Sequence, residues 1–152
     1  MKIDDKTHKV AVVLPYIDNK VLLQLRDFKS GIIFPGNWGF FGGAVEDGED
    51  PQEAARRELL EEIGFNVEVL CELGAEQYPL LENTFLYSFF CALKMPIEKI
   101  VLGEGFDFGL FTLEEIVTGK LYSEKAKKFS PVIPSNYIAE KVSILFNRIK
   151  NG

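Results

Sequence analysis

Three glutamates near the middle of the chain, Glu58, Glu61 and Glu62, are spaced three and four residues apart. In an α-helix this spacing places the three carboxylates within a sector of about 100° on one face. Like charges gathered on one face destabilise a helix unless a positive group lies among them. A divalent cation such as Mg²⁺ suits such a face, because it prefers oxygen ligands. The alternative, for each glutamate taken alone, is an ordinary solvated helix face.

Two neighbouring features favour the same chemistry. Gly42-Gly43 precedes the acidic segment, and glycines let the backbone approach an ion or a phosphate closely, with their carbonyls as ligands. Arg57 lies beside Glu58, where a guanidinium is able to orient an acid through a bidentate pair. Together these residues predict a site for a divalent cation and a phosphorylated substrate.

The acids also belong to a longer pattern, which reads Gly43, five residues, Glu49, seven residues, Arg57-Glu58-Leu59, one residue, Glu61-Glu62, one residue, Gly64-Phe65. The pattern resembles the Nudix box, Gly-x5-Glu-x7-Arg-Glu-U-x-Glu-Glu-x-Gly-U with U a bulky apolar residue, at every fixed position. A chance match in a chain of this length has a probability on the order of 10⁻⁷.

The resemblance implies the Nudix fold, an α/β (α+β) arrangement with a mixed β-sheet sandwiched between helices and the box as a loop–helix–loop. The length of 152 residues and the absence of a repeat or linker in the sequence predict a single domain over residues 1–152. The resemblance also implies hydrolysis, by water and with Mg²⁺ or in its place Mn²⁺, of a diphosphate bond in a nucleoside diphosphate linked to another group. A nucleotide sugar or a (d)NTP is the expected kind of substrate.

By the same resemblance, the expected metal ligands are Glu58, Glu61, Glu62 and the carbonyl of Gly42 or Gly43. Glu61 is alternatively the base that takes the proton from water. The residues expected to hold the helix and its acids in place are Glu49 and Arg57.

Three residues outside the box complete the predicted site. Glu104 lies in a Gly-Glu-Gly loop that is similar to the acidic loop of family members that remove oxidised nucleotides, so it is a second candidate for the base. Arg26 resembles the family position that meets the phosphate or the base of the substrate. Trp38 is a candidate to stack on a base. The alternatives are a solvated acid, a surface arginine and a packing tryptophan.

The helix that must carry the acids has clear ends in the sequence. Asp50 is a good N-cap, Pro51 suits the first helical position, and Glu53 stands where a capping box places it. Gly64 is placed to end the helix. Around it we expect strands at residues 8–15, 20–26, 38–41, 65–73, 83–94 and 108–111, a loop at 27–36, a short helix from Thr112 to Gly119 and a final helix at 135–150.

Composition limits the partners. The net charge of −6 disfavours a long nucleic acid, which binds through Lys and Arg, and leaves a small nucleotide as the expected partner. The stretch Lys125–Lys128 is either a phosphate attractant or a solvated charge run. Residues 1–6 lack the apolar stretch of a signal peptide, and the longest apolar run, residues 84–97, is too short to span a bilayer. We therefore expect a cytoplasmic protein with free cysteines and no membrane partner. A homodimer is compatible with this expectation.

Other functions compatible with the pattern remain as alternatives. The main one is a non-catalytic Nudix-fold module that senses a nucleotide or binds a partner, although such modules usually lack one of the box acids. RNA cap removal is disfavoured by the acidic pI of about 4.9. Isopentenyl diphosphate isomerase chemistry needs metal-binding histidines, and His8 is the only histidine in the chain.

Overall fold

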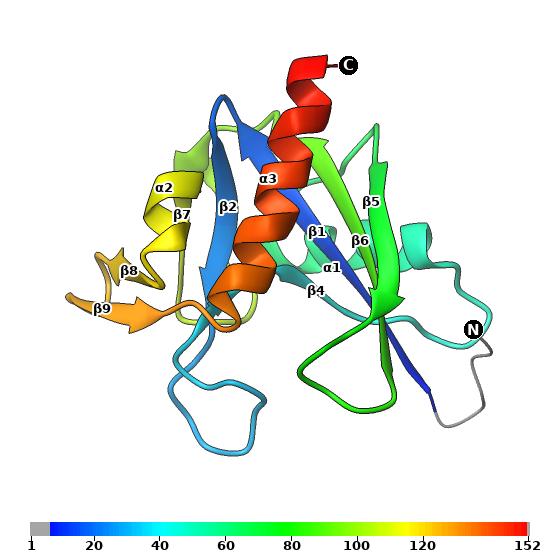
Figure 1. Ribbon diagram of the computed structural model, residues 1–152, viewed down its shortest axis with the longest axis horizontal. Coiled ribbons are helices and arrows are strands. Elements are labelled where there is room, and N and C mark those ends of the chain that lie inside the picture. Colours follow the sequence, from blue (N-terminus) through cyan, green and yellow to red (C-terminus); the bar gives the residue numbers. More distant parts are fainter. Residues whose placement is uncertain (1–6, 152) are drawn as a thin grey trace.

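The computed structural model describes residues 7–151 and has a mixed seven-stranded sheet at its centre (Figure 1). Its elements are, in order, β1 (His8–Ile17), β2 (Lys20–Leu25), β3 (Trp38–Gly39), β4 (Phe41–Ala44), α1 (Pro51–Ile63), β5 (Cys71–Gln77), β6 (Thr84–Ala92), the 3₁₀ helix η1 (Ile97–Lys99), β7 (Asp107–Thr112), α2 (Leu113–Val117), β8 (Lys120–Ser123), β9 (Lys128–Pro131) and α3 (Ser135–Asn151). None of the helices in residues 7–151 is long and apolar enough to cross a membrane.

The main sheet has the order β3-β2-β1-β6-β5, with β7 paired to β2 and β4 paired to β1. β1 runs parallel to β6 and antiparallel to β2 and β4. The chain from Trp38 to Ala44 therefore starts on β2 as β3 and continues on β1 as β4. This crossing pairs Gly42 with Val12 and Gly43 with Ala11 of β1, the strand in the middle of the sheet order.

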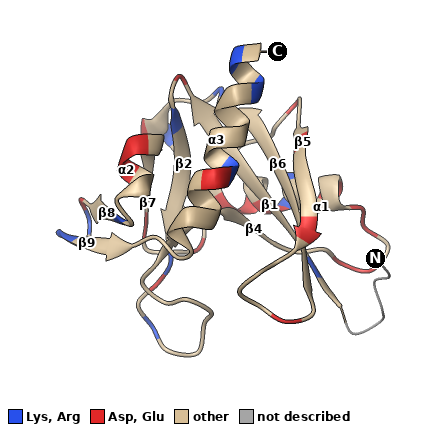
Figure 2. Cartoon of the chain, viewed as in Figure 1, with Lys and Arg blue, Asp and Glu red and all other residues tan. Residues whose placement is uncertain are grey.

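Alternate residues of the central strands face two separate cores, as the two-residue period of a strand requires. Val13 and Phe89 pack with the apolar side of α1, whereas their neighbours Leu14 and Phe90 pack with α2 and α3. The sheet is thus covered by α1 on one face and by α2 and α3 on the other, which confirms the predicted mixed sheet between helices. Figure 2 shows acidic residues in both α1 and α2.

The helix α1 begins and ends where the sequence predicts. The side chain of Asp50 accepts a hydrogen bond from the amide of Glu53 at 2.9 Å, and Pro51 occupies the first turn. Gly64 adopts φ 73° and donates its N–H to the carbonyl of Leu60, which ends the helix. The second helix also has its predicted cap, because Thr112 and Glu115 form a capping box.

Three predictions about elements are wrong in detail. The strand expected at 65–73 begins only at Cys71, because the side chain of Arg56 on α1 donates to the carbonyls of Val67 and Glu68 and holds that segment against the helix. The strand expected at 38–41 is two strands separated by Phe40. The hairpin of β8 and β9 stands where no strand was expected.

Candidate active site and metal-binding cleft

A cleft of about 720 Å³ opens beside the N-terminal part of β4 and the last turns of α1. It is lined by Gln24, Arg26, Asp27, Lys29, Ile32, Gly42, Gly43, Glu58, Glu62, Gly103, Glu104 and Gly105. The fold therefore brings together residues from β2, from β4, from α1 and from the loop before β7. Six of the residues predicted from sequence line this cleft, namely Gly42, Gly43, Glu58, Glu62, Glu104 and Arg26.

Glu58 and Glu62 face the two glycines of β4 at close range. The amide of Gly42 donates a hydrogen bond to Oε2 of Glu62 at 3.0 Å. A Cβ atom at Gly43 would lie only 2.5 Å from Oε1 of Glu58, so any other residue there would displace the carboxylate. The glycine pair thus serves the site by its lack of side chains, which lets α1 bring both acids against the backbone.

The environment of both carboxylates disfavours their charged form. Glu62 is 8% exposed, and burial together with the negative charge of Glu58 raises its pKa to about 8. Burial also raises the pKa of Glu58, against the opposing effect of the Arg57 guanidinium. A divalent cation between them would stabilise both anions, since Mg²⁺ takes oxygen ligands of this kind. The donor set of one buried and one half-buried carboxylate beside the backbone of Gly42 and Gly43 therefore fits a hard cation.

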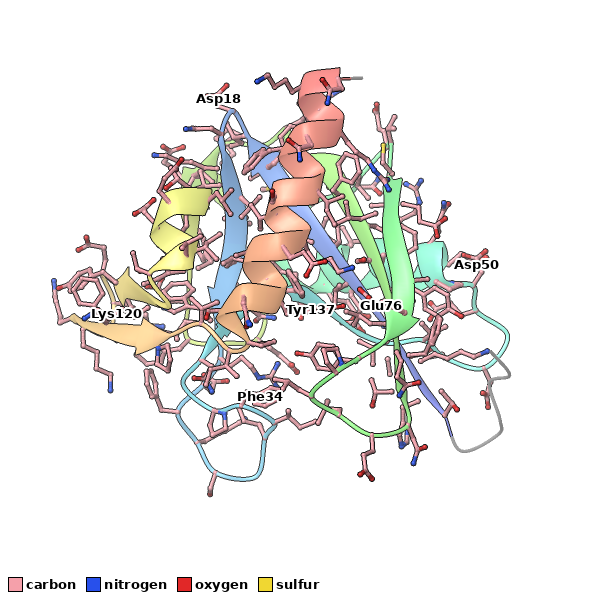
Figure 3. The ribbon with its side chains drawn as sticks, viewed as in Figure 1. Asp18, Phe34, Asp50, Glu76, Lys120 and Tyr137 are labelled. Carbon is pink, nitrogen blue, oxygen red and sulfur yellow. The ribbon has the colours of Figure 1, made fainter. Side chains whose placement is uncertain are left out.

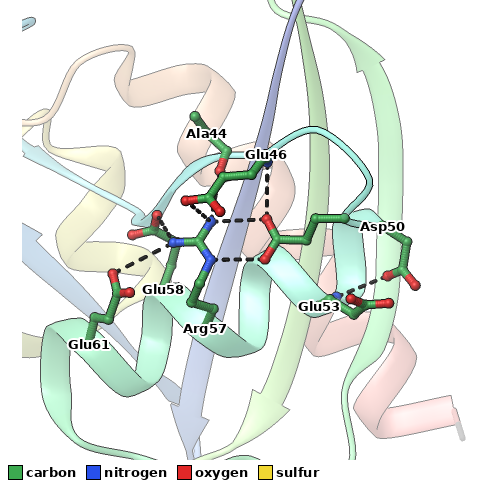
Figure 4. A network of polar contacts seen from close by, with 8 residues as sticks. Ala44, Glu46, Asp50, Glu53, Arg57, Glu58 and Glu61 are labelled. Carbon is green, nitrogen blue, oxygen red and sulfur yellow. Dashed lines mark hydrogen bonds and ion pairs between the residues drawn. The ribbon is translucent and has the colours of Figure 1, made fainter.

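Arg57 joins the loop before α1 to the acids on the helix (Figure 4). Its Nε and one terminal nitrogen donate to the two carboxylate oxygens of Glu49 at 2.9 and 3.0 Å. The other terminal nitrogen donates to Oε1 of Glu58 at 2.9 Å, and the guanidinium also reaches the carbonyl of Ala44 at 3.0 Å. The bidentate partner is thus Glu49, and Arg57 orients Glu58 through a single bond.

Glu61 lies differently from the other two box acids. Its side chain is 59% exposed, and its carboxylate lies 3.6 Å from a terminal nitrogen of Arg57. It is not among the residues that line the cleft. Within residues 7–151, no three acidic, cysteine or histidine side chains converge on one point. The role of Glu61 as a ligand or a base remains a prediction.

The loop that carries Glu104 is docked on the end of α1. The amide of Gly103 donates to the carbonyl of Glu62 at 2.8 Å, and a Cβ at Gly103 would lie 2.5 Å from the carbonyl oxygen of Glu61. This contact needs a glycine, and it places Glu104 on the rim of the cleft. The negative charge of Glu104 contributes to the raised pKa values of both Glu58 and Glu62.

Two cations, Arg26 and Lys29, line the same cleft as the acids. Arg26 follows β2, donates to the carbonyl of Ile33 at 2.6 Å and lowers the pKa of Glu62 by its charge. Lys29 also lines the cleft, and sequence reasoning missed it, together with Gln24 and Asp27. The sequence places Lys29 in the loop of residues 27–36, but the geometry that brings this loop to the cleft is known only from the fold.

A second cavity of about 260 Å³ adjoins the cleft and shares Arg26, Gly42 and Gly43 with it. Its walls are mostly apolar and aromatic, among them Phe34, Phe40, Tyr78, Leu86 and Ile138. Figure 3 labels Phe34 in the loop of residues 27–36, below the first turns of α3. The cleft is thus mainly polar and the second cavity mainly apolar, and the glycine pair lines both of them.

Trp38 lines the apolar cavity but is 1% exposed. Its indole N–H donates to the carbonyl of Leu121 at 3.0 Å, and its ring packs edge-on against Phe111 at 4.9 Å. The residue is thus anchored in the core, and its stacking on a substrate base remains a prediction.

Comparison with known proteins agrees with this geometry. The family model described as a NUDIX domain matches residues 6–132. An oxidized purine nucleoside triphosphate hydrolase from Danio rerio is 38% identical over 77 residues, which are 51% of this chain and 47% of that protein. A nucleoside triphosphatase from Enterobacter sp. (strain 638) is 41% identical over 59 residues, 38% of this chain and 42% of that protein. The matches thus span about half the length of these relatives or less.

Solved structures show the same fold. The MutT protein from Methanosarcina mazei Go1 superposes with a TM-score of 0.68 at 19% identity, and the alignment covers 96% of both chains. A MutT NUDIX hydrolase from Burkholderia pseudomallei superposes with a TM-score of 0.61 at 21% identity over 71% of this chain and 84% of that one. At these identities the likeness establishes the fold alone.

Proposed function

Because the chain belongs to the Nudix family, we propose that it hydrolyses a diphosphate bond in a nucleoside triphosphate or a related nucleoside diphosphate derivative, with Mg²⁺ as cofactor. The observation that carries this proposal is the pair of carboxylates, half-buried Glu58 and buried Glu62, held against the backbone of Gly42 and Gly43. The names of the relatives from Danio rerio and Enterobacter, both nucleoside triphosphate hydrolases, support the class of substrate.

Each group of residues in the cleft has a separate proposed role. Glu58 and Glu62 would hold Mg²⁺, with Mn²⁺ able to replace it, and Arg57 keeps Glu58 oriented through its bond at 2.9 Å. When bound, the cation supplies positive charge to the phosphate oxygens and makes the attacking water more acidic. Arg26 and Lys29, which line the same cleft, would add positive charge for the phosphate chain.

The proton of the attacking water needs an acceptor at the rim of the cleft. Glu104 lines the cleft and is exposed, so it is free to accept that proton without the cost of a buried charge. Glu61 is the alternative base, and it would first have to leave its ion pair with Arg57. Comparing Glu104→Gln with Glu61→Gln in single-turnover kinetics distinguishes the two, because only the base variant flattens the pH–rate profile.

The apolar cavity supports a nucleotide as the substrate. It shares the two glycines with the cleft, so a molecule whose phosphates lie at Glu58 and Glu62 would place its remaining part between Phe40 and Tyr78. Aromatic and aliphatic walls bind a flat base by stacking and burial. A cavity that offers mostly apolar contacts discriminates weakly between bases, so several nucleoside triphosphates are expected to be accepted.

The test is Mg²⁺-dependent release of phosphate or pyrophosphate from a panel of normal and oxidised (d)NTPs, nucleotide sugars and ADP-ribose. We expect Glu62→Gln to leave the fold intact, by circular dichroism, and to reduce the rate to below about a tenth of wild type. Glu114→Gln, which changes an exposed acid on α2, is the matched control and should keep full activity. A Glu62→Gln variant above a tenth of the wild-type rate contradicts the assignment of this carboxylate as a ligand. Nucleotide binding without turnover by the wild type would favour a non-catalytic module.

A further inference from the structure

A polar cluster that takes no part in the chemistry above lies between β5 and α3. Lys141 on α3 is 7% exposed, and its ammonium pairs with Oε1 of Glu76 on β5. The hydroxyl of Tyr137 donates to the same oxygen at 2.9 Å. Figure 2 shows basic colour in the middle of α3 and acidic colour at the end of β5, and Figure 3 labels Glu76 and Tyr137 at this junction.

In this ion pair only the lysine is buried, because the side chain of Glu76 remains 44% exposed. Removing the Lys141 ammonium from water is expensive, and an apolar side chain of similar size often stabilises a protein as well or better. What a charged, hydrogen-bonded cluster adds is a defined direction for each side chain, because hydrogen bonds depend on geometry where apolar contacts do not. Such a cluster therefore suits a place where a neighbouring side chain must keep a fixed position.

That neighbour is Tyr78, just after the end of β5. The rings of Tyr78 and Tyr137 meet edge to face with their centroids 5.4 Å apart. Tyr78 lines the apolar cavity, and so does Ile138, the residue that follows Tyr137 on α3. The backbone of Tyr78 is held separately, since its amide donates to the carbonyl of Thr84 at 2.8 Å. Its ring is thus positioned by Tyr137, and the ring of Tyr137 by Glu76.

We propose that Glu76, Tyr137 and Lys141 are positioning residues that fix the ring of Tyr78 as a wall of the apolar cavity and so set its affinity for a flat aromatic group. The inference rests on the proposed function, because it takes the group in the cavity to be the base of a nucleotide substrate. If the ring of Tyr78 is already fixed before binding, less conformational entropy is lost when the base binds than with a mobile ring. The cluster therefore acts on binding of the base and not on the phosphate chemistry.

The competing explanation is that the cluster only stabilises the packing of α3 on the sheet. The chain offers a matched control for this purely structural role. Arg148, farther along α3, donates to the carbonyls of Glu72 at 2.5 Å and Leu73 at 3.1 Å, and so ties the same helix to the same strand. Arg148 does not line the apolar cavity. Arg148→Met removes a fastening of α3 without touching Tyr78, whereas Tyr137→Leu removes the ring that contacts Tyr78.

The experiment is a double-mutant cycle in which KM and kcat are measured for a nucleoside triphosphate. Inorganic tripolyphosphate, which has no base, serves as the probe of phosphate binding, and its Ki is measured for the same variants. We expect Tyr137→Leu and Tyr78→Ala each to raise KM about three- to tenfold with kcat within about twofold. In the Tyr78→Ala background, Tyr137→Leu should raise KM no further, because Tyr137 acts through Tyr78. Tyr137→Phe, which keeps the ring and loses only the bond to Glu76, should give a smaller rise. The Ki of tripolyphosphate should not change in any of these variants.

Three results would overturn the inference. One is an unchanged KM in Tyr137→Leu, and another is a rise of equal size in Arg148→Met. The third is a full additional effect of Tyr137→Leu when Tyr78 is already alanine. If the wild type hydrolyses no substrate, the proposed function fails, and the same cycle is then measured as the Kd of a nucleoside monophosphate by calorimetry. Coupling between Tyr78 and Tyr137 in Kd would uphold the positioning role without hydrolysis, and its absence would overturn it.

Discussion

Glu62 shows how a single residue can link metal binding to stability. Its carboxyl group is buried beside Gly42 and near Glu58, and its pKa is raised to about 8. An acid with a raised pKa in the folded state holds its proton more tightly there than in the unfolded chain, where the pKa is about 4.3. The folded state is therefore favoured most at low pH, and this advantage is lost as the pH rises through about 8.

The first prediction follows at this scale. Without divalent cations, the free energy of unfolding should fall by a few kcal/mol between about pH 5 and pH 9, given about 1.36 kcal/mol for each unit of pKa. Urea unfolding at several pH values with a chelator measures the slope, and added Mg²⁺ should stabilise the protein more at pH 8 than at pH 6. Glu62→Gln should reduce the slope and leave the part that belongs to Glu58. An equal slope in the variant would contradict the raised pKa of Glu62.

At the scale of elements, the site depends on how the loop before β7 meets the end of α1. Gly103 donates to the carbonyl of Glu62, and its Cα lies against the backbone of Glu61. The loop is therefore held by the same helix turn that carries the acids, and Glu104 follows in the chain. The position of the candidate base relative to Glu58 and Glu62 thus depends on this backbone contact, and the amide of Phe106, which donates to the carbonyl of Leu25 at 2.8 Å, holds the other end of the loop.

The second prediction tests that contact. In Gly103→Ala the new Cβ would meet the carbonyl oxygen of Glu61 at 2.5 Å, so the loop must move away from α1. If Glu104 is the base, kcat should fall to about the level of Glu104→Gln, a loss on the order of 10²-fold. Gly74→Ala is the control, because its Cβ would find ordinary contacts at 3.7 Å or more. Gly103→Ala with wild-type kcat would show that Glu104 is not needed in this position.

At the scale of the whole molecule, Trp38 connects the two sheets. Its indole N–H reaches the carbonyl of Leu121 in β8, and its backbone bridges to Val132 after β9. On its other side it packs against Phe111 of β7. The hairpin of β8 and β9, which lies at the edge of the molecule in Figure 1, is thus joined to the main sheet through a buried side chain.

The third prediction concerns this connection. Trp38→Phe removes the N–H donor and leaves a cavity, so the free energy of unfolding should fall by about 1–3 kcal/mol. Tyr122→Phe on β8 changes an exposed aromatic residue, and its cost should stay below about 0.5 kcal/mol. Chemical denaturation followed by circular dichroism compares the two. A loss below 0.5 kcal/mol in Trp38→Phe would mean that the indole bond contributes little to the docking of the hairpin.

Features that depend on neighbouring residues could be predicted from the sequence. Asp50, Pro51 and Gly64 predicted the ends of α1, because capping is a matter of a few adjacent residues. The family pattern predicted the mixed sheet between helices, and with it the helix that carries Glu58 and Glu62. The strands β1, β2 and β6 were also predicted nearly at their observed bounds, since they are continuous apolar segments.

Features that depend on residues far apart in the chain could not be predicted and are seen only in the folded protein. Glu61 and Glu62 are adjacent in sequence, yet Glu62 is buried against Gly42 while Glu61 pairs with Arg57 at the surface. The apolar cavity collects side chains from β1, from the loop of residues 27–36, from β6 and from α3. Glu76 and Lys141 meet across 65 positions of sequence. Periodicity shows which face of an element is apolar, but the partner of that face follows only from how the elements pack.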